Sequence, residues 1–127
     1  TPAGKFIYRK YNRFKKLFES LLEDARGSID KNSAIIFFKY DEDKYSMTKD
    51  LAGQLMHENP KKVIIIGRKK ENDFRMSLRG KNIRPVLEKA LKGIDGYGGG
   101  HMNACGANVK VWDLEKFIEN FKKELNN

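Results

Sequence analysis

The most unusual stretch of the chain reads Asp95-Gly96-Tyr97-Gly98-Gly99-Gly100-His101-Met102-Asn103-Ala104-Cys105-Gly106-Ala107-Asn108. It holds five of the eleven glycines, and one of the two histidines follows the triple glycine. Glycine loses more backbone entropy on ordering than any other residue, so the stretch predicts a loop and not a helix or strand. A concave run of backbone amides suits an anion such as phosphate. We therefore expect a phosphate-binding loop that also carries His101 and Asn103.

A second candidate element lies upstream, at residues 73–79. Its side chains alternate with a period of two, with Phe74, Met76 and Leu78 on one face and Arg75, Ser77 and Arg79 on the other. The planar guanidinium of arginine suits bidentate contact with phosphate, and a serine hydroxyl adds a neutral donor. The pattern predicts an edge or surface strand that presents Arg-Ser-Arg to a ligand. An ordinary amphipathic strand with solubilising charges fits the alternation equally well.

The remaining periodicity predicts an α/β fold, with a mixed sheet of about four to five strands and helices packed on its faces. Apolar runs at residues 34–38 and 63–66 are typical of strands buried on both sides. Apolar residues spaced by three and four predict helices over 5–25 and from Ser46 or Thr48 to before Pro60, and two more capped by Asn82 and Asp113. Residues 107–111 alternate as a short strand.

The length and net charge of the chain limit the classes of protein to which it can belong. A chain of 127 residues is expected to form a single domain, 1–127, and its start at Thr1 suggests excision from a longer chain. Its net charge of +9 should attract polyanions, of which nucleic acid is the commonest inside cells; a merely lysine-rich protein is the alternative. A single cysteine, no signal-peptide pattern and no membrane-spanning apolar run predict a cytoplasmic protein without a membrane partner.

Two charged segments have less specific interpretations. Residues 1–16 contain six Lys or Arg and no acid, interleaved with aromatic residues. They could bind a nucleic-acid strand, but an amphipathic packing helix over 1–27 with a solvated basic back is favoured. Asp41-Glu42-Asp43 is interpreted as a solvated turn, because consecutive carboxylates on an extended chain point to alternate sides and no further ligand lies nearby.

The order of these elements resembles a known family. Gly98-Gly99-Gly100-His101, followed by Asn103-Ala104 and Gly106-Ala107, is similar to the signature of the DHH-associated domain, type 1, and Ser77-Leu78-Arg79 matches its Ser-x-Arg step. The resemblance covers residues 30–125. That domain is the C-terminal half of DHH-family phosphoesterases, which include RecJ-like single-strand exonucleases, oligoribonucleases and cyclic-dinucleotide phosphodiesterases.

The resemblance implies a substrate-binding role. It assigns phosphate contacts to Gly98, Gly99, Gly100, His101, Asn103, Arg75, Ser77 and Arg79, with single-stranded nucleic acid, a short oligonucleotide or a cyclic dinucleotide as substrate. The metal-binding aspartates and the Asp-His-His motif belong to a preceding catalytic domain. This chain has no Asp-His-His, so Mn²⁺ or Mg²⁺ is implied for that domain only, and the fragment alone is expected to be inactive.

Two departures from the family pattern matter. Cys105 occupies a position that usually holds a small residue, and it is interpreted as a packing residue and not as a nucleophile. A related glycine-rich domain ends alanyl-tRNA synthetases, where histidine typically does not follow the glycines. An RNA- or tRNA-binding module of that kind is the alternative function.

Overall fold

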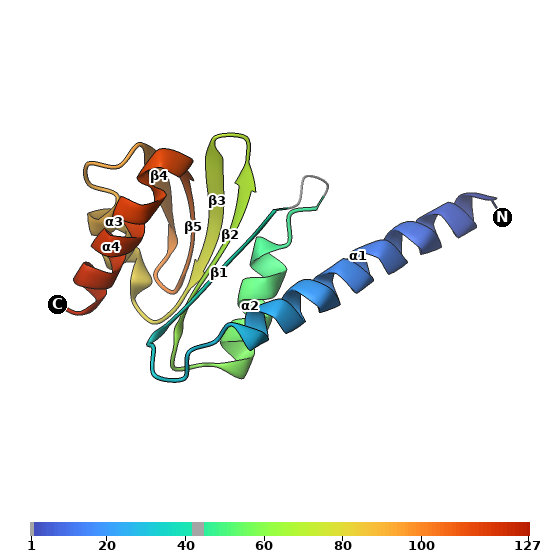
Figure 1. The fold of residues 1–127 in the computed structure, drawn as a ribbon, viewed down its shortest axis with the longest axis horizontal. Coiled ribbons are helices and arrows are strands. Elements are labelled where there is room, and N and C mark those ends of the chain that lie inside the picture. The colour runs from blue at the N-terminus through green and yellow to red at the C-terminus, as the bar shows by residue number, and fades with distance from the viewer. Residues whose placement is uncertain (1, 42–44) are drawn as a thin grey trace.

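The computed structural model describes residues 2–41 and 45–127 (Figure 1). A five-stranded mixed sheet, in the order β1-β2-β3-β5-β4, is formed by β1 (Ile35–Asp41), β2 (Val63–Lys70), β3 (Asp73–Arg79), β5 (Ala104–Lys110) and β4 (Gly96–His101). β1 and β2 are parallel, and the other neighbours are antiparallel. The helices are α1 (Pro2–Gly27), α2 (Thr48–Glu58), α3 (Ile83–Ala90) and α4 (Leu114–Leu125). The predicted α/β fold is confirmed.

One face of the sheet is covered by α3 and α4. The apolar face of β3 lies here, as its alternation predicts, against inward side chains of both helices. This cluster includes Phe74, Met76, Leu78, Cys105, Ala107, Val109, Leu87, Phe117 and Phe121. Burial of such apolar side chains is the main stabilising contribution to the fold.

The opposite face is covered only in part. α2 lies over β2 and β3, α1 packs against α2, and the buried residues of this second cluster are Leu22, Ala25, Ile36, Tyr40, Met47, Leu51, Ala52, Leu55, Ile64 and Ile66. β3, β5 and β4 contribute no apolar side chain to it. In Figure 1, α1 leaves the molecule on the side of β1, away from β4. Within the described residues, the face that points away from α3 and α4 is therefore open over β5 and β4, and α2 covers it in part over β3.

The position of β3 corrects a prediction. Its polar side chains suggested an edge or surface strand, but β3 is the middle strand, between β2 and β5. A period of two identifies the two faces of a strand and carries no information about its neighbours. The polar face of β3 is therefore not evidence of an edge position: α2 covers Ser77, while Arg75 is exposed and Arg79 is half-buried.

The predicted starts of α3 and α4 are in the right positions, but the predicted capping hydrogen bonds do not form. Asn82 and Asp113 occupy the N-cap positions of α3 and α4, and neither side chain caps its own helix. The Asp113 carboxylate instead accepts a hydrogen bond from the Asp95 amide at 2.7 Å. Val111 begins a 3-10 turn, η1 (Val111–Asp113), and does not extend the last strand.

α1 has two unlike halves. Leu22 and Ala25 in its second half are buried against α2 and the sheet, as the packing interpretation predicts. In its first half, Ile7, Tyr8 and Tyr11 are 62–67% exposed. Only the second half of the predicted apolar face is therefore used for packing within the described chain.

An ion pair fixes the end of α1 to the end of α2, and it leads to a prediction about pH. Arg26 donates from Nε and Nη2 to the two carboxylate oxygens of Glu58, at 2.9 and 2.6 Å. These bonds hold the pKa of Glu58 at about 2. Because this pKa is depressed, the pair stabilises the fold above the ordinary carboxyl range and loses its contribution as pH falls towards 2.

Thermal unfolding of Glu58→Gln tests this prediction. The pair is largely exposed, so we expect Tm to fall by at most a few degrees at neutral pH. The difference from wild type should shrink steadily between about pH 4.5 and 2. Glu23→Gln, which removes the more exposed partner of Arg26, is the matched control and should cost less. A difference that is independent of pH would contradict the ion-pair explanation.

Candidate functional site

The glycine-rich stretch forms strand β4, not the predicted loop. The reason is a close approach to β5. A Cβ atom at Gly98 would lie 2.8 Å from the carbonyl oxygen of Gly106, and one at Gly96 would lie 2.5 Å from that of Asn108. Gly100 adds a positive φ of 143°, which side chains rarely adopt. The glycines thus permit tight pairing of an edge strand, and the two-residue turn at residues 102–103 joins it to β5.

The strand pairing places three rows of residues across the open face. Paired residues of antiparallel strands point to the same side of a sheet, and alternate residues point to opposite sides. From β3 through β5 to β4, the rows are Arg79-Ala104-His101, then Ser77-Gly106-Gly99, then Arg75-Asn108-Tyr97. We call this set of nine residues the open face. None of the nine is acidic.

The middle row forms a shallow floor between the other two. A Cβ at Gly99 would meet nothing within 4 Å, and one at Gly106 would meet only a backbone oxygen at 3.7 Å. The outer rows lie four residues apart along each strand, which is roughly 14 Å. A hollow of about 410 Å³ begins here and is lined by Arg75, Met76, Tyr97, Gly106, Ala107 and Asn108. Backbone atoms are therefore accessible to a ligand between two rows of polar side chains.

Three cationic or protonatable side chains surround this floor. Arg75 and His101 are exposed, and neither side chain has a hydrogen-bond or ion-pair partner among the described residues. Arg79 is half-buried, and its Nη1 donates to the carbonyl oxygens of Leu78 at 2.9 Å and Cys105 at 3.2 Å. A guanidinium has five N–H donors, so the rest remain available to a ligand. The arrangement suits an anion with several oxygen atoms.

Ser77 departs from its predicted exposure. It is only 4% exposed, because the first turn of α2 lies over it. Its hydroxyl donates to Thr48 Oγ1 at 2.9 Å, which attaches the start of α2 to the middle strand. The side chain therefore lies at the end of the floor that α2 covers, and its hydroxyl proton is already used in the hydrogen bond to Thr48.

Asn103 lies outside the three rows, in the turn between β4 and β5. Its Oδ1 accepts a hydrogen bond from the backbone amide of Asn82 at 2.9 Å, and its carbonyl oxygen accepts one from Gly80 at 3.0 Å. These bonds fix the turn against the segment that precedes α3. Asn103 holds β4 in place, and its role as a phosphate ligand stays a prediction.

Cys105 faces α3 and α4 and is buried in their cluster. Its thiol donates to the carbonyl oxygen of His101 at 3.1 Å, and burial raises the pKa of the thiol. A raised pKa reduces the thiolate fraction, so these observations agree with the packing interpretation.

The described residues contain no metal-binding constellation. No three His, Cys, Asp or Glu side chains lie close enough there to hold an ion. Of the acidic turn, Asp41 is described and exposed, while Glu42 and Asp43 lie outside the described residues. Residues 2–41 and 45–127 also include no helix long and apolar enough to cross a membrane.

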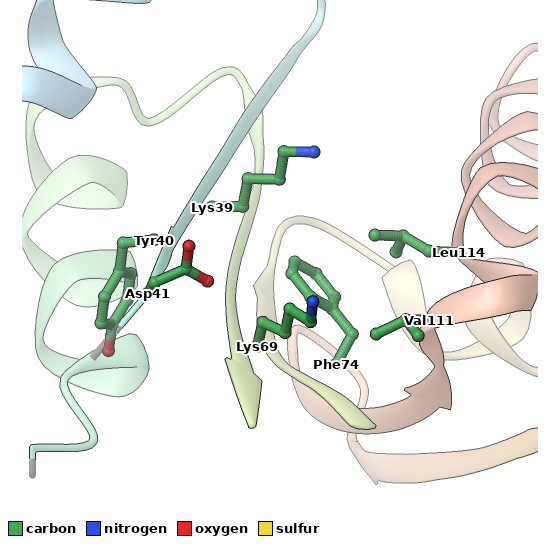
Figure 2. A pocket seen from close by; sticks show the side chains of 7 residues that line it. All are labelled: Lys39, Tyr40, Asp41, Lys69, Phe74, Val111 and Leu114. Carbon is green, nitrogen blue, oxygen red and sulfur yellow. The ribbon is translucent and has the colours of Figure 1, made fainter. Parts of the chain in front are cut away.

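A second hollow, of about 390 Å³, lies on the other face of the sheet near α4 (Figure 2). Its rim carries Lys39, Asp41 and Lys69, and Phe74, Val111 and Leu114 line its apolar part. Figure 2 shows Lys39 reaching towards Leu114, while Tyr40 points to the opposite side of the strand. None of the residues that the sequence predicts for phosphate contact lines this hollow. We therefore take the open face as the candidate site.

Sequence reasoning missed Tyr97 and Asn108, which complete the third row. The signal was present: Tyr97, Gly99 and His101 alternate with a period of two, as on one face of a strand. The interpretation of the glycines as a loop concealed it.

Comparisons with known proteins agree with the architecture. The family model of the DHHA1 domain matches residues 32–127. No curated protein matches the chain. Among solved structures, RecJ from Thermus thermophilus in complex with Mg²⁺ is similar with a TM-score of 0.76 and 14% identity, over 97% of this chain and 20% of that one.

Two further structures share the fold. The pGpG-specific phosphodiesterase PggH from Vibrio cholerae has a TM-score of 0.62 and 15% identity, over 99% of this chain and 43% of that one. The C-Ala domain of Aquifex aeolicus alanyl-tRNA synthetase has a TM-score of 0.63 and 19% identity, over 73% of this chain and 91% of that one. The chain thus spans less than half of RecJ or PggH, and nearly all of the C-Ala domain.

Proposed function

The chain belongs to the DHHA1 domain family, and on that premise we propose that its open face binds the phosphates of single-stranded nucleic acid or of a short oligonucleotide. The observation that carries the proposal is the grouping of Arg75, Arg79 and His101 around a floor of backbone atoms without an acid in any of the three rows. Phosphate oxygens would accept hydrogen bonds from the two guanidinium groups and the imidazole. The accessible backbone of Gly99 and Gly106 lets the nucleic-acid strand approach the sheet closely.

The parent protein that we propose is a metal-dependent phosphodiesterase or exonuclease. A DHH catalytic domain in the same chain would supply the Mn²⁺ or Mg²⁺, and this domain would hold the substrate. The similarities to RecJ and PggH cover 97% and 99% of the chain, so they include the 26-residue helix α1. That extent favours a parent of the phosphodiesterase type.

A tRNA-binding module is the second candidate. The similarity to the C-Ala domain extends over 91% of that domain and 73% of this chain, so the part of the fold that the two share does not separate the two functions. His101 favours the phosphodiesterase, because it follows the glycines as in the DHH-linked type. The two functions differ in their ligand: a substrate clamp should bind an isolated trinucleotide, whereas a tRNA-binding module should bind folded tRNA far more tightly than any short strand.

Salt dependence tests the phosphate contacts. Each neutralised phosphate of a single strand lowers log K by about 0.7 per decade of salt. Between about 50 and 200 mM salt, we expect affinity for a short single strand to fall roughly sevenfold for two contacts and twentyfold for three. Fluorescence anisotropy of a labelled oligonucleotide measures it. Affinity that does not change with salt, or no binding at low salt, would contradict the proposal.

A further inference from the structure

The row Arg75-Asn108-Tyr97 contains an aromatic ring and an amide group, neither of which is needed to bind a phosphate. Tyr97 is 71% exposed. It projects from an edge strand onto a face whose neighbouring row is mostly glycine. Its ring is therefore accessible to a ligand that lies on this face.

Tyr97 and Asn108 line two hollows. One, of about 410 Å³, lies towards Arg75 and Gly106, and the other, of about 310 Å³, lies towards Asp95 and Lys110. The phenol oxygen lies 3.5 Å from Nδ2 of Asn108, so the ring extends along the row over β5. A flat aromatic surface thus borders the glycine floor, with an amide group at its end.

We propose that Tyr97 stacks on an unpaired nucleobase of the strand whose phosphates occupy the floor, and that Asn108 contacts the edge of that base; this inference rests on the proposed function. An aromatic ring stacks on every base, because each base has a π-face. One N–H of the Asn108 amide points to the Tyr97 oxygen, and its second N–H and its carbonyl oxygen can contact a base edge. A base inside a duplex is stacked and paired, so the subsite selects single strands.

Arg75 links this subsite to the phosphate floor. It is exposed, lies in the same row as Tyr97, and lines the same hollow. A phosphate held by Arg75 and the backbone of Gly106 would therefore carry a sugar whose base lies next to Tyr97. The subsite recognises a nucleotide as a unit, and not a phosphate alone.

The test compares two ligands by NMR titration of the chain in low salt. One is an adenine trinucleotide with a terminal phosphate, and the other has the same backbone without bases. We expect wild type to prefer the base-containing strand by about fivefold to 150-fold, the effect of one stacked base. Tyr97→Ala should remove this preference and leave affinity for the abasic strand unchanged. Tyr97→Phe should retain it.

Tyr11→Ala, which removes a comparably exposed tyrosine from α1, is the matched control and should retain the preference. A preference that survives in Tyr97→Ala, or an equal loss for both ligands, would overturn the inference and leave the phosphate site intact. Failure of wild type to bind either strand would overturn the proposed function and the stacking subsite together.

Discussion

His101→Ala is expected to lower turnover on a short oligonucleotide by about 10²–10³-fold in the full-length protein, in which we place a DHH catalytic domain. That is the scale of removing one positioned electrostatic donor. The imidazole is exposed and has no side-chain partner among the described residues, so its loss leaves no cavity and no unpaired buried group. Tm should therefore change by no more than about 2 °C. Steady-state kinetics and a melting curve of the same preparation measure both quantities.

The other histidine provides the control. His57 is also exposed, near the end of α2, and it lies outside the open face. His57→Ala should leave both turnover and Tm unchanged. If His101→Ala instead lowers Tm strongly while turnover per folded molecule stays constant, His101 is a structural residue and the site is misassigned. Arg79→Ala is less diagnostic, because its guanidinium also bonds two backbone carbonyls.

Valine at Gly98 and at Gly99 should have opposite consequences. At Gly98, even a Cβ atom would lie within 3 Å of Gly106 and Ala107 in β5, so valine forces the two strands apart. We expect a loss of roughly 3 kcal/mol or more in the free energy of unfolding, and a fall in Tm of about 10 °C or more. At Gly99 the space is open. Valine there should leave Tm unchanged or raise it, because valine favours a strand more than glycine does.

The two substitutions should have the opposite ranking in their effect on ligand affinity, with Gly99→Val weakening binding more than Gly98→Val. The side chain of Gly99→Val would occupy the floor between the two outer rows, and affinity for a short strand should fall about tenfold, as expected for one or two lost hydrogen bonds. Gly98 belongs to the alternate set of β4, facing α3 and α4, so Gly98→Val acts through folding alone. Equal losses of stability at the two positions would contradict the pairing described here.

The architecture could be predicted from the sequence because apolar periodicity is a local signal. Phe74, Met76 and Leu78 are buried where the alternation places them, and the family pattern at Gly98–His101 leads to the same fold. The glycines of β4 show the limit of this reasoning. Their low strand propensity is also local, but the need for glycine at positions 96, 98 and 100 arises from β5, which would clash with a Cβ there.

The same limit applies to the site. Ser77 looked exposed because its strand neighbours Arg75 and Arg79 are charged, but the turn of α2 that covers it is distant in the sequence. Sequence order also could not show that β3 lies beside β5 and β5 beside β4. Only that pairing brings Arg75, Arg79 and His101 onto one surface. The residue types were predictable, and their grouping was not.

The most direct test of the central claim is a map of backbone amide shifts on titration with a phosphorylated trinucleotide in low salt. The proposed site predicts that the largest shifts fall on Gly99, Gly106 and their neighbours in β3, with little change in α3 and α4. Shifts confined to the basic first half of α1, or to the hollow beside α4, would show that the strand binds elsewhere and would contradict the account.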